Sequence, residues 1–274
     1  MTPAAACRVS GHFGELIQGL LGHNGPMAVI SLPCPVLAVT ATSKPNQHLS
    51  LHCVNGAVLS VGRAQKFLGL LGLTCAARVI LRATMPLGGG AGSSTAALVA
   101  LARLAGWSGH PAALARACLA VEGATDPLMF DHPDRLLWAS RRAEIIATLP
   151  ALPAFDVVGG FFGPSRRTNG RDVAFPDVAD LVHDWHRAAL AQDLPTLANL
   201  ASQSANRTLA LRGAAPDPTA HLTRDLEALG YVAGHTGSAR GLIYPCGKVP
   251  PDAKAVLRRA GFTRVIQFRT TGAA

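Results

Sequence analysis

One glycine-rich stretch, Met85 to Ala97, constrains the fold of this chain more than any other feature. It reads MPLGGGAGSSTAA and lies between an apolar run typical of a strand and an Ala- and Leu-rich run typical of a helix. Glycine has no Cβ, so its backbone adopts positive φ readily and can come close to a bound group. The N–H groups at the start of the following helix would point back at the loop. The stretch therefore predicts a strand, an anion-binding loop and a helix.

The spacing in this loop excludes two common phosphate-binding loops. A Walker loop needs a Gly-Lys pair, and the chain has no lysine between Lys66 and Lys248. A dinucleotide-binding fingerprint needs a third glycine three residues after Gly92, where Thr95 stands, and an acid about 20 residues further on, where the chain has none. A loop of small residues that only packs a strand against a helix remains the alternative.

Length and composition indicate a globular protein of one large or two small domains. The chain has 274 residues, of which 49% are hydrophobic, and Arg, Gly or Pro interrupts every apolar run before it reaches the length of a membrane span. The N-terminus lacks the basic start and long apolar centre of a signal peptide. The six cysteines form no CxxC pair, which argues against a zinc site or a disulfide framework. We expect a cytoplasmic protein that neither spans nor binds a membrane.

The net charge of +9 suggests nucleic-acid binding, but the distribution of charge does not support it. Basic residues are spread thinly and only 5% of residues are aromatic, so we expect no nucleic-acid partner. Acids are absent between Glu15 and Glu122 and then cluster, with Asp126, Asp131 and Asp134 following. This pattern favours a polyanion at the glycine loop and a counter-cation at the acids. An Ala- and Arg-rich composition with few acids throughout is the alternative.

Hydrophobic periodicity predicts a β-rich first half. We expect strands at 6–13, 28–32, 36–42, 48–53, 57–61 and 77–85, a short polar turn at 14–19, and helices at 64–73, 93–106 and 110–123. Beyond these, the pattern predicts strands at 144–149 and 155–163, helices at 176–194, 195–213, 217–230 and 250–261, a glycine-rich turn leading into a strand within 232–245, and a last strand at 262–269. The predicted elements change from mainly strands to mainly helices along the chain, and we place a domain boundary near residue 150.

Together these motifs resemble the GHMP kinases, the superfamily of galactokinase, homoserine kinase, mevalonate kinase and phosphomevalonate kinase. The segment Pro86–Ala96 matches the central motif of that superfamily with Ala91 in place of leucine, and Gly234–Gly241 resembles its C-terminal glycine turn. The resemblance implies an α+β fold of two domains. A β-rich domain at 1–150 would carry the glycine loop and helices, and a ferredoxin-like domain would follow at 151–274.

A narrower resemblance concerns GELIQG, at Gly14–Gly19, which is similar to a marker of the L-threonine kinases of cobamide synthesis and propanediol utilisation. A Leu-Pro-Cys-Pro segment and the later EGATD and DVVGG stretches support it. Two departures stand out. The lead-in Val9–Phe13 replaces a Pro-Ala-Ser-Cys type of sequence, and one extra residue separates Glu122 from Asp126. The first departure affects the predicted contact with the substrate, and the second affects the predicted catalytic role of Asp126.

The superfamily resemblance implies roles in phosphoryl transfer, which depends mainly on positioning and charge neutralisation. The residues implied to bind ATP are Pro86, Gly88, Gly89, Gly90, Ala91, Gly92, Ser93, Ser94 and Thr95. Ser94 and Glu122 would bind Mg²⁺, which prefers oxygen ligands. Asp126 would orient the substrate hydroxyl and accept its proton, or only orient it. The alternatives are a solvated acid at a helix end for Glu122 and a turn before Pro127 for Asp126.

The acceptor would be held by residues of two segments. Glu15, Gln18 and His12 are placed to contact an amino acid, with Glu15 at its ammonium group. Thr236, Gly237, Ser238 and Arg240 would lie near the transferred phosphate or the substrate carboxylate. The alternatives are an exposed turn for Glu15, a structural histidine for His12 and a tight loop that closes a strand pair for the second turn. Asn206 belongs either to the pocket wall or to the solvent-exposed surface.

These resemblances imply an ATP- and Mg²⁺-dependent kinase that converts L-threonine into L-threonine O-3-phosphate. A kinase for homoserine or another alcohol, and a non-catalytic ligand-binding relative, are the alternatives. The expected partner is a small-molecule substrate, and the sequence leaves a homodimer open.

Overall fold

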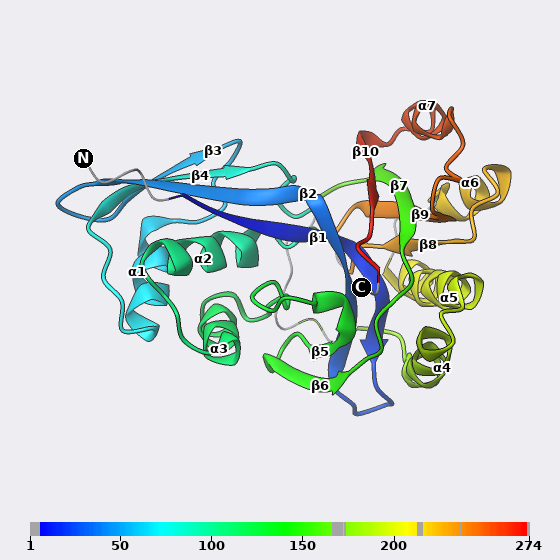
Figure 1. Cartoon of the computed structure of the whole chain (residues 1–274), viewed down its shortest axis with the longest axis horizontal. Helices are drawn as coiled ribbons and strands as arrows, with labels where there is room; N and C mark the ends of the chain where they lie inside the picture. The colour runs from blue at the N-terminus through cyan, green and yellow to red at the C-terminus, as the bar shows by residue number, and fades with distance from the viewer. Residues whose placement is uncertain (1–5, 166–171, 173, 213–215, 236, 273–274) are drawn as a thin grey trace.

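The structure is a computed structural model that describes residues 6–165, 172, 174–212, 216–235 and 237–272. The described residues form one mixed sheet of ten strands, with eight in the order β10-β7-β9-β8-β1-β2-β4-β3 and with β5 and β6 branching from β2 (Figure 1). The strands are β1 (Ala6–Leu20), β2 (Met27–Pro45), β3 (Ser50–Val54), β4 (Ala77–Ala83), β5 (Leu136–Ala139), β6 (Glu144–Thr148), β7 (Phe155–Phe161), β8 (Gly230–Ala233), β9 (Ala239–Pro245) and β10 (Thr263–Arg269).

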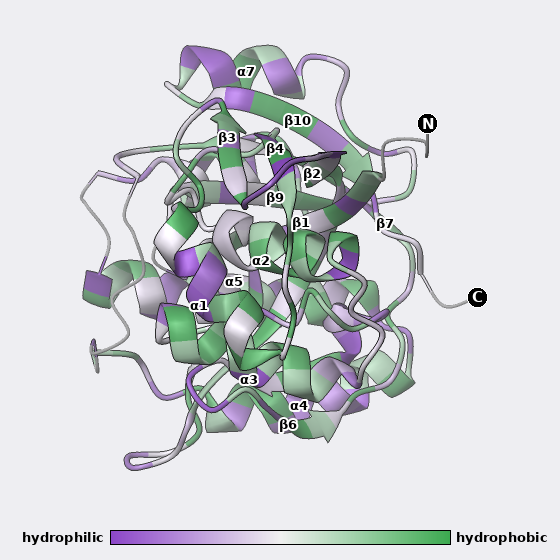
Figure 2. Cartoon of the chain, turned by 90° about the vertical axis from the view of Figure 1, so that its left-hand side faces the viewer, coloured by the Kyte–Doolittle hydropathy of each residue, from purple (hydrophilic) through white to green (hydrophobic). Residues whose placement is uncertain are grey.

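The helices pack mainly against the central strands. They are α1 (Val61–Leu70), α2 (Ser93–Leu104), α3 (Pro111–Glu122), α4 (Ala179–Leu190), α5 (Leu194–Arg212), α6 (Thr219–Asp225) and α7 (Ala253–Arg259), with a 3₁₀ turn at Pro133–Arg135. Helix α2 lies against β1 and β2, whereas α5 lies against β1 and β8. Residues 95–102 of α2 are all buried, and the helix lies among other elements in Figure 2. Among the described helices, none has both the length and the apolar character required to cross a bilayer.

Two of our local predictions for the first half are wrong. GELIQG is not a polar turn, because β1 continues through it to Leu20 and its residues are buried. The register with β2 shifts around His12 and Glu15, which lets the strand bend while it stays paired. The expected strand at 57–61 is also absent, since the Ser60 hydroxyl accepts a hydrogen bond from the Arg63 N–H and begins α1 at Val61.

Strand β1 takes part in both halves of the molecule. It pairs along most of its length with β2, and at Glu15 it pairs with Ala233 of β8. The four strands β10, β7, β9 and β8 are antiparallel neighbours, with α5, α6 and α7 packed against them. The connection from β6 to β7 contains residue 150, and the domain boundary there stays a prediction. The sheet brings the second part of β1 beside the C-terminal strands.

Candidate active site

A cavity of about 240 Å³ opens beside the glycine loop and the middle of β1. Its wall combines segments that are distant in sequence: β1, the start of α1, the glycine loop and the first turn of α2, the connection from α3 to β5, the turn after β5, and the end of β8. The predicted site residues that line it are His12, Glu15, Gly88, Gly90, Ala91, Gly92, Ser93, Ser94, Thr95, Glu122 and Asp126. The fold therefore brings the predicted phosphate loop and the predicted acids to one cavity.

The glycine loop has a backbone suited to an anion. Gly88, Gly90 and Gly92 have φ values of 69°, 74° and 71°, a conformation that costs glycine little. Gly92 is the N-cap of α2 and supplies no side-chain cap. The first N–H groups of the helix therefore stay available at the cavity wall. Predicted residues Pro86 and Gly89 lie outside the wall, and Gly89 packs against Phe161 instead.

Strand β1 holds the loop in place. The backbone N–H of His12 donates to the Ala91 carbonyl at 3.2 Å, and the N–H of Gly14 donates to the Gly90 carbonyl at 3.3 Å. A Cβ on Gly92 would come within 2.7 Å of the His12 ring. The loop and the predicted substrate-binding strand therefore form one rigid wall.

In the second glycine-rich turn, His235 lines the cavity, whereas Gly237 is packed behind the first turn. A Cβ on Gly237 would come within 2.1 Å of the Gly90 nitrogen, and the Ala239 N–H donates to the Gly89 carbonyl at 3.0 Å. Arg240 is buried and pairs with Asp217 at 2.8 Å. Gly237, Ser238 and Arg240 do not line the wall. Predicted residue Thr236 lies outside the described residues.

Gln18 and Asn206 also lie away from the cavity. The Gln18 side chain donates to the Ala233 carbonyl at 3.0 Å, and its backbone N–H donates to the Ser204 hydroxyl at 2.9 Å. Asn206 accepts a hydrogen bond from the Tyr231 hydroxyl. Their contacts join β1, β8 and α5.

Arg63, Ser94 and Glu122 form the first polar cluster of the cavity, which we call the Glu122 group. The Ser94 hydroxyl and the Arg63 guanidinium both donate to Oε1 of Glu122. The Glu122 side chain is 10% exposed, whereas that of Arg63 is 41% exposed. Burial raises the pKa of Glu122, while Ser94 and Arg63 act in the opposite direction. A hydroxyl oxygen beside a carboxylate is a donor set that fits Mg²⁺.

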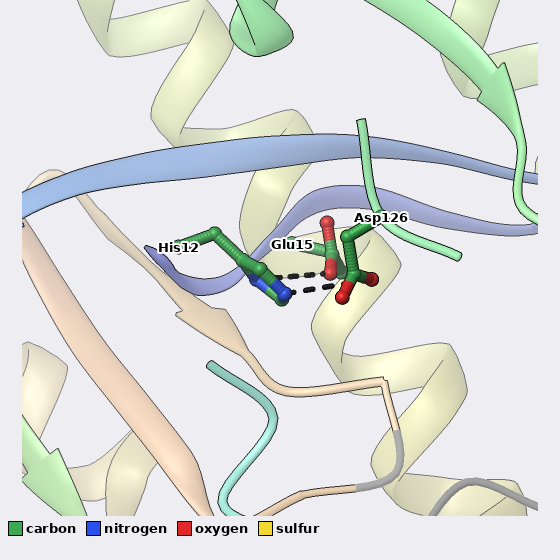
Figure 3. Close-up of side chains that lie close together, drawn as sticks. All are labelled: His12, Glu15 and Asp126. Carbon is green, nitrogen blue, oxygen red and sulfur yellow. Dashed lines mark ion pairs between the residues drawn. The ribbon is translucent and has the colours of Figure 1, made fainter. Parts of the chain in front are cut away.

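His12, Glu15 and Asp126 form the second cluster, which we call the Glu15 group (Figure 3). Nδ1 of His12 lies 3.3 Å from Oε1 of Glu15, and Nε2 lies 3.6 Å from Oδ1 of Asp126. The ligand atoms of the three residues lie within 4.8 Å of one another, close enough for one metal ion to touch them all. A protonated His12 already places a positive charge between the two carboxylates.

The charges of the Glu15 group depend on one another. Burial opposes the charged form of His12, but the carboxylates of Glu15 and Asp126 outweigh it and raise the pKa of His12 to about 9. Burial raises the pKa of Glu15 to about 7, and the charge of His12 limits the rise. Burial acts against ionised Asp126, yet His12 and the Thr95 hydroxyl lower the pKa of Asp126. At neutral pH, Asp126 is therefore ionised and His12 protonated.

The segment that carries Asp126 is attached to β5. The Thr125 N–H donates to the Ser140 carbonyl at 2.8 Å, and the indole of Trp138 donates to the Thr125 carbonyl at 2.7 Å. The Asp126 N–H also lies 3.4 Å from the Thr95 hydroxyl of α2. Asp126 is therefore positioned between the first turn of α2 and β5, with its side chain 29% exposed.

Among the lining residues that were not predicted from the sequence, three have ionisable side chains: Arg63, Arg141 and His235. The His235 ring stacks on Phe175 with centroids 4.5 Å apart and an interplanar angle of 14°. The guanidinium of Arg141 lies 5.0 Å from the centroid of the same ring. His235 lies within the Gly234–Gly241 turn, although it was not among the residues predicted there, so its place in that motif was the one signal available in the sequence. Arg63 and Arg141 carry no local motif.

A scan against protein-family models gives no match, and a search among curated protein sequences gives none either. Solved structures do match over nearly the whole chain. Mevalonate kinase from methicillin-resistant Staphylococcus aureus MRSA252 is 17% identical, with 97% of this chain and 99% of that chain covered and a TM-score of 0.61. The chain has the two-domain α+β fold of the GHMP kinases.

Two further neighbours share this fold. Homoserine kinase from Cytophaga hutchinsonii is 13% identical, with 99% and 96% of the two chains covered and a TM-score of 0.66. L. major mevalonate kinase, solved in complex with R-mevalonate, is 12% identical, with 99% and 98% covered and a TM-score of 0.68. The predicted fold class is confirmed, and at these identities the similarity concerns the fold.

Proposed function

We propose that this protein is an ATP-dependent kinase that phosphorylates the hydroxyl of a small molecule, with L-threonine as the acceptor and L-threonine O-3-phosphate as the product. The observation that carries the proposal is the single cavity in which the glycine loop, the Glu122 group and the Glu15 group meet. A kinase needs an anion cradle, a metal ligand and a group that positions the acceptor within one site.

The two ends of the cavity have separate roles in this proposal. The backbone of Gly88, Gly90 and Gly92 and the start of α2 hold the phosphates of ATP. Ser94 and Glu122 would hold Mg²⁺, which supplies positive charge to the phosphate oxygens when bound. Arg63 then leaves Glu122, which its exposed position permits.

At the other end, Asp126 accepts a hydrogen bond from the acceptor hydroxyl and takes its proton as the phosphoryl group is transferred. Its lowered pKa keeps it ionised but also makes it a weak base, so orientation of the hydroxyl is its larger contribution. His12 keeps Asp126 in place through its Nε2 atom.

L-Threonine is supported by GELIQG and by the environment of Glu15. Within the described part of the chain, Oε2 of Glu15 has no hydrogen-bond partner although the residue is only 2% exposed. An unsatisfied buried carboxylate oxygen at a cavity wall is suited to a donor on a ligand, such as an ammonium group. The presence of homoserine kinases among proteins of this fold supports homoserine as the alternative acceptor.

The test is an ADP-release assay with Mg-ATP and a panel of L-threonine, L-serine, L-homoserine and alcohols without an amino group. We expect the highest kcat/KM for L-threonine and a product that is phosphorylated on the side-chain oxygen. Faster turnover of homoserine than of threonine would make homoserine the acceptor, and the proposed kinase activity would still stand. No turnover with any acceptor would refute the proposed activity.

A further inference from the structure

Val29 of β2 gives the cavity an apolar surface away from the glycine loop. Of the described residues that line the cavity, three have apolar side chains larger than alanine: Val29, Val58 and Leu87. Leu87 belongs to the glycine loop, and a Cβ on Gly56 would come within 3.0 Å of its Cδ1 atom, so Leu87 lies beside the segment that leads through Val58 into α1. Val29 comes instead from the sheet and is 3% exposed. It therefore serves a different part of the cavity from the other two.

The register of β1 and β2 places Val29 close to Glu15. Glu15 pairs with Ser31, and Val29 lies two residues from Ser31, on the same face of β2. Glu15 and Val29 both line the cavity. Diagonal neighbours across an antiparallel pair are about 7 to 8 Å apart. A ligand group bound by Glu15 is therefore within reach of Val29.

Val29 is equally close to the segment that carries Asp126. On its other side β2 pairs with β5 at Val29 and Trp138. The Trp138 indole donates to the Thr125 carbonyl at 2.7 Å, and Asp126 follows Thr125 directly. The backbone of Val29 is thus fixed between two strands, beside both segments that carry the proposed acceptor contacts.

We propose that Val29 contacts the methyl group on the hydroxyl-bearing carbon of the acceptor, and that this contact makes the enzyme prefer L-threonine to L-serine. The inference rests on the proposed kinase function and adds a residue that determines specificity. Glu15 and Asp126, which face the same His12 ring (Figure 3), would hold the ammonium and hydroxyl groups on adjacent carbons. The methyl group then needs an apolar surface beside both contacts, and Val29 supplies it.

The surroundings of Val29 make this contact selective. Thr125 and Ser140 line the wall near Asp126, and a methyl group placed against them would desolvate polar groups without giving them a hydrogen bond. Valine is branched at Cβ, so its side chain has little rotational freedom, and the backbone of Val29 is paired on both sides. One methyl group in an apolar pocket gives roughly 10- to 200-fold selectivity.

The experiment measures the ratio of kcat/KM for L-threonine to that for L-serine, with Mg-ATP and detection of ADP release. This ratio is independent of the fraction of correctly folded enzyme, which matters because Val29 also belongs to the hydrophobic core. The variants are Val29→Ala, which withdraws the contact, and Val29→Ile, which fills the space of the methyl group. The matched control is Val39→Ala, because Val39 is a buried valine of the same strand that is not among the described lining residues.

Wild-type enzyme should prefer L-threonine by roughly 10- to 200-fold. Val29→Ala should lower the ratio by about three- to tenfold, because only L-threonine has a methyl group that loses an apolar partner. Val29→Ile should lower it further, since the added methylene group occupies the place of the threonine methyl group and leaves room for L-serine. Val39→Ala should keep the wild-type ratio.

A ratio that is unchanged or raised in either Val29 variant would overturn the inference, and so would an equal fall in Val39→Ala, which would trace the effect to the core. Wild-type enzyme that uses L-serine as well as L-threonine, or homoserine with neither of them, would also overturn it and leave the kinase function intact. Wild-type enzyme that is inactive with every acceptor would remove both proposals.

Discussion

The Glu122 group and the Glu15 group each place a glutamate beside a cation, half-buried in the first and buried in the second, and the two arrangements differ in how exposed the cation is. Arg63 reaches Glu122 from α1 with a side chain that is 41% exposed. His12 lies three residues from Glu15 on the same strand, and its side chain is 4% exposed. A mobile surface cation can be exchanged for a metal ion, whereas a buried neighbour on one strand cannot leave.

This difference is consistent with the different roles proposed for the two glutamates, metal binding for Glu122 and acceptor binding for Glu15. Burial raises the pKa of both glutamates. At Glu122 the opposing contacts come from a hydroxyl and an exposed guanidinium, both compatible with metal binding. At Glu15 the charge is linked to that of Asp126 through His12, so under the proposed function the binding of an acceptor ammonium group would be coupled to the residue proposed to contact the acceptor hydroxyl.

The largest expected effect is on the Glu15 group. Asp126→Asn should lower kcat by about 10²- to 10⁴-fold, because the amide cannot accept the hydroxyl proton and its NH₂ group can face the acceptor. Steady-state kinetics with L-threonine measure the change. Asp131→Asn, an exposed acid on the same connection, is the control and should keep the wild-type kcat. A wild-type kcat in Asp126→Asn would exclude Asp126 from the reaction.

The next effect concerns the Glu122 group. Glu122→Gln should raise the Mg²⁺ concentration for half-maximal activity by roughly 10- to 100-fold and lower kcat, since a charged ligand is lost. Ser94→Ala should change the same quantity in the same direction by less. Titration of activity with Mg²⁺ at constant ATP measures both, with the exposed Glu144→Gln as control. Unchanged magnesium dependence in both variants would refute this metal assignment.

The third prediction tests whether His12 sets the charge of Asp126. In the wild type, protonated His12 holds the pKa of Asp126 below its usual value. His12→Gln removes that charge and leaves burial, which raises the pKa of a carboxyl group. The acidic limb of the kcat/KM profile should therefore move up by about one pH unit.

Above pH 9, wild-type His12 loses its proton, because the pKa of His12 is about 9. The wild-type profile should therefore change on its alkaline side, and this change should be missing in His12→Gln. The pKa of Glu15, about 7 in the wild type, should rise in His12→Gln, because the charge of His12 lowers it. Superimposable profiles would show that His12 only supports the strand.

The smallest effect on activity is expected from substitution of Arg63, the exposed cation beside Glu122. Arg63→Gln should lower the Mg²⁺ requirement by roughly two- to fivefold, because an ion pair of this exposure contributes up to about 1 kcal/mol to holding Glu122. The control is Lys66→Gln, which removes an exposed charge from the same helix. A raised KM for ATP with unchanged magnesium dependence would show that Arg63 contacts phosphate and does not compete with the metal.

The two glycine-rich turns differ in how they are placed relative to the cavity. The first turn, at Gly88–Gly92, was predicted to line a site, and it does so at the start of α2. The second was predicted to contact the acceptor, yet Gly237 is packed against the backbone of Gly90. Both turns need glycine, one for an anion-binding backbone and one for close packing, and composition does not distinguish these needs.

Polar residues on β1 were misjudged for a related reason. Glu15 and Gln18 suggested a polar turn after the strand that carries His12, because polar side chains in a short segment usually face solvent. In the structure they are buried, with His12 and Glu15 at the cavity and Gln18 between β1, β8 and α5. A functional strand breaks the usual alternation of polar and apolar residues.

The sequence by itself predicted the glycine loop, the helix after it and the acids at Glu122 and Asp126, because glycine spacing and helical periodicity are local properties of the chain. Only the tertiary structure decided that Arg63, Arg141 and His235 join them, and that Arg240 does not. The residues that flank a single arginine in the sequence form no pattern that indicates its role. Its neighbours come from other elements, so its function depends on how the sheet brings α1, β5 and β8 to the same cavity.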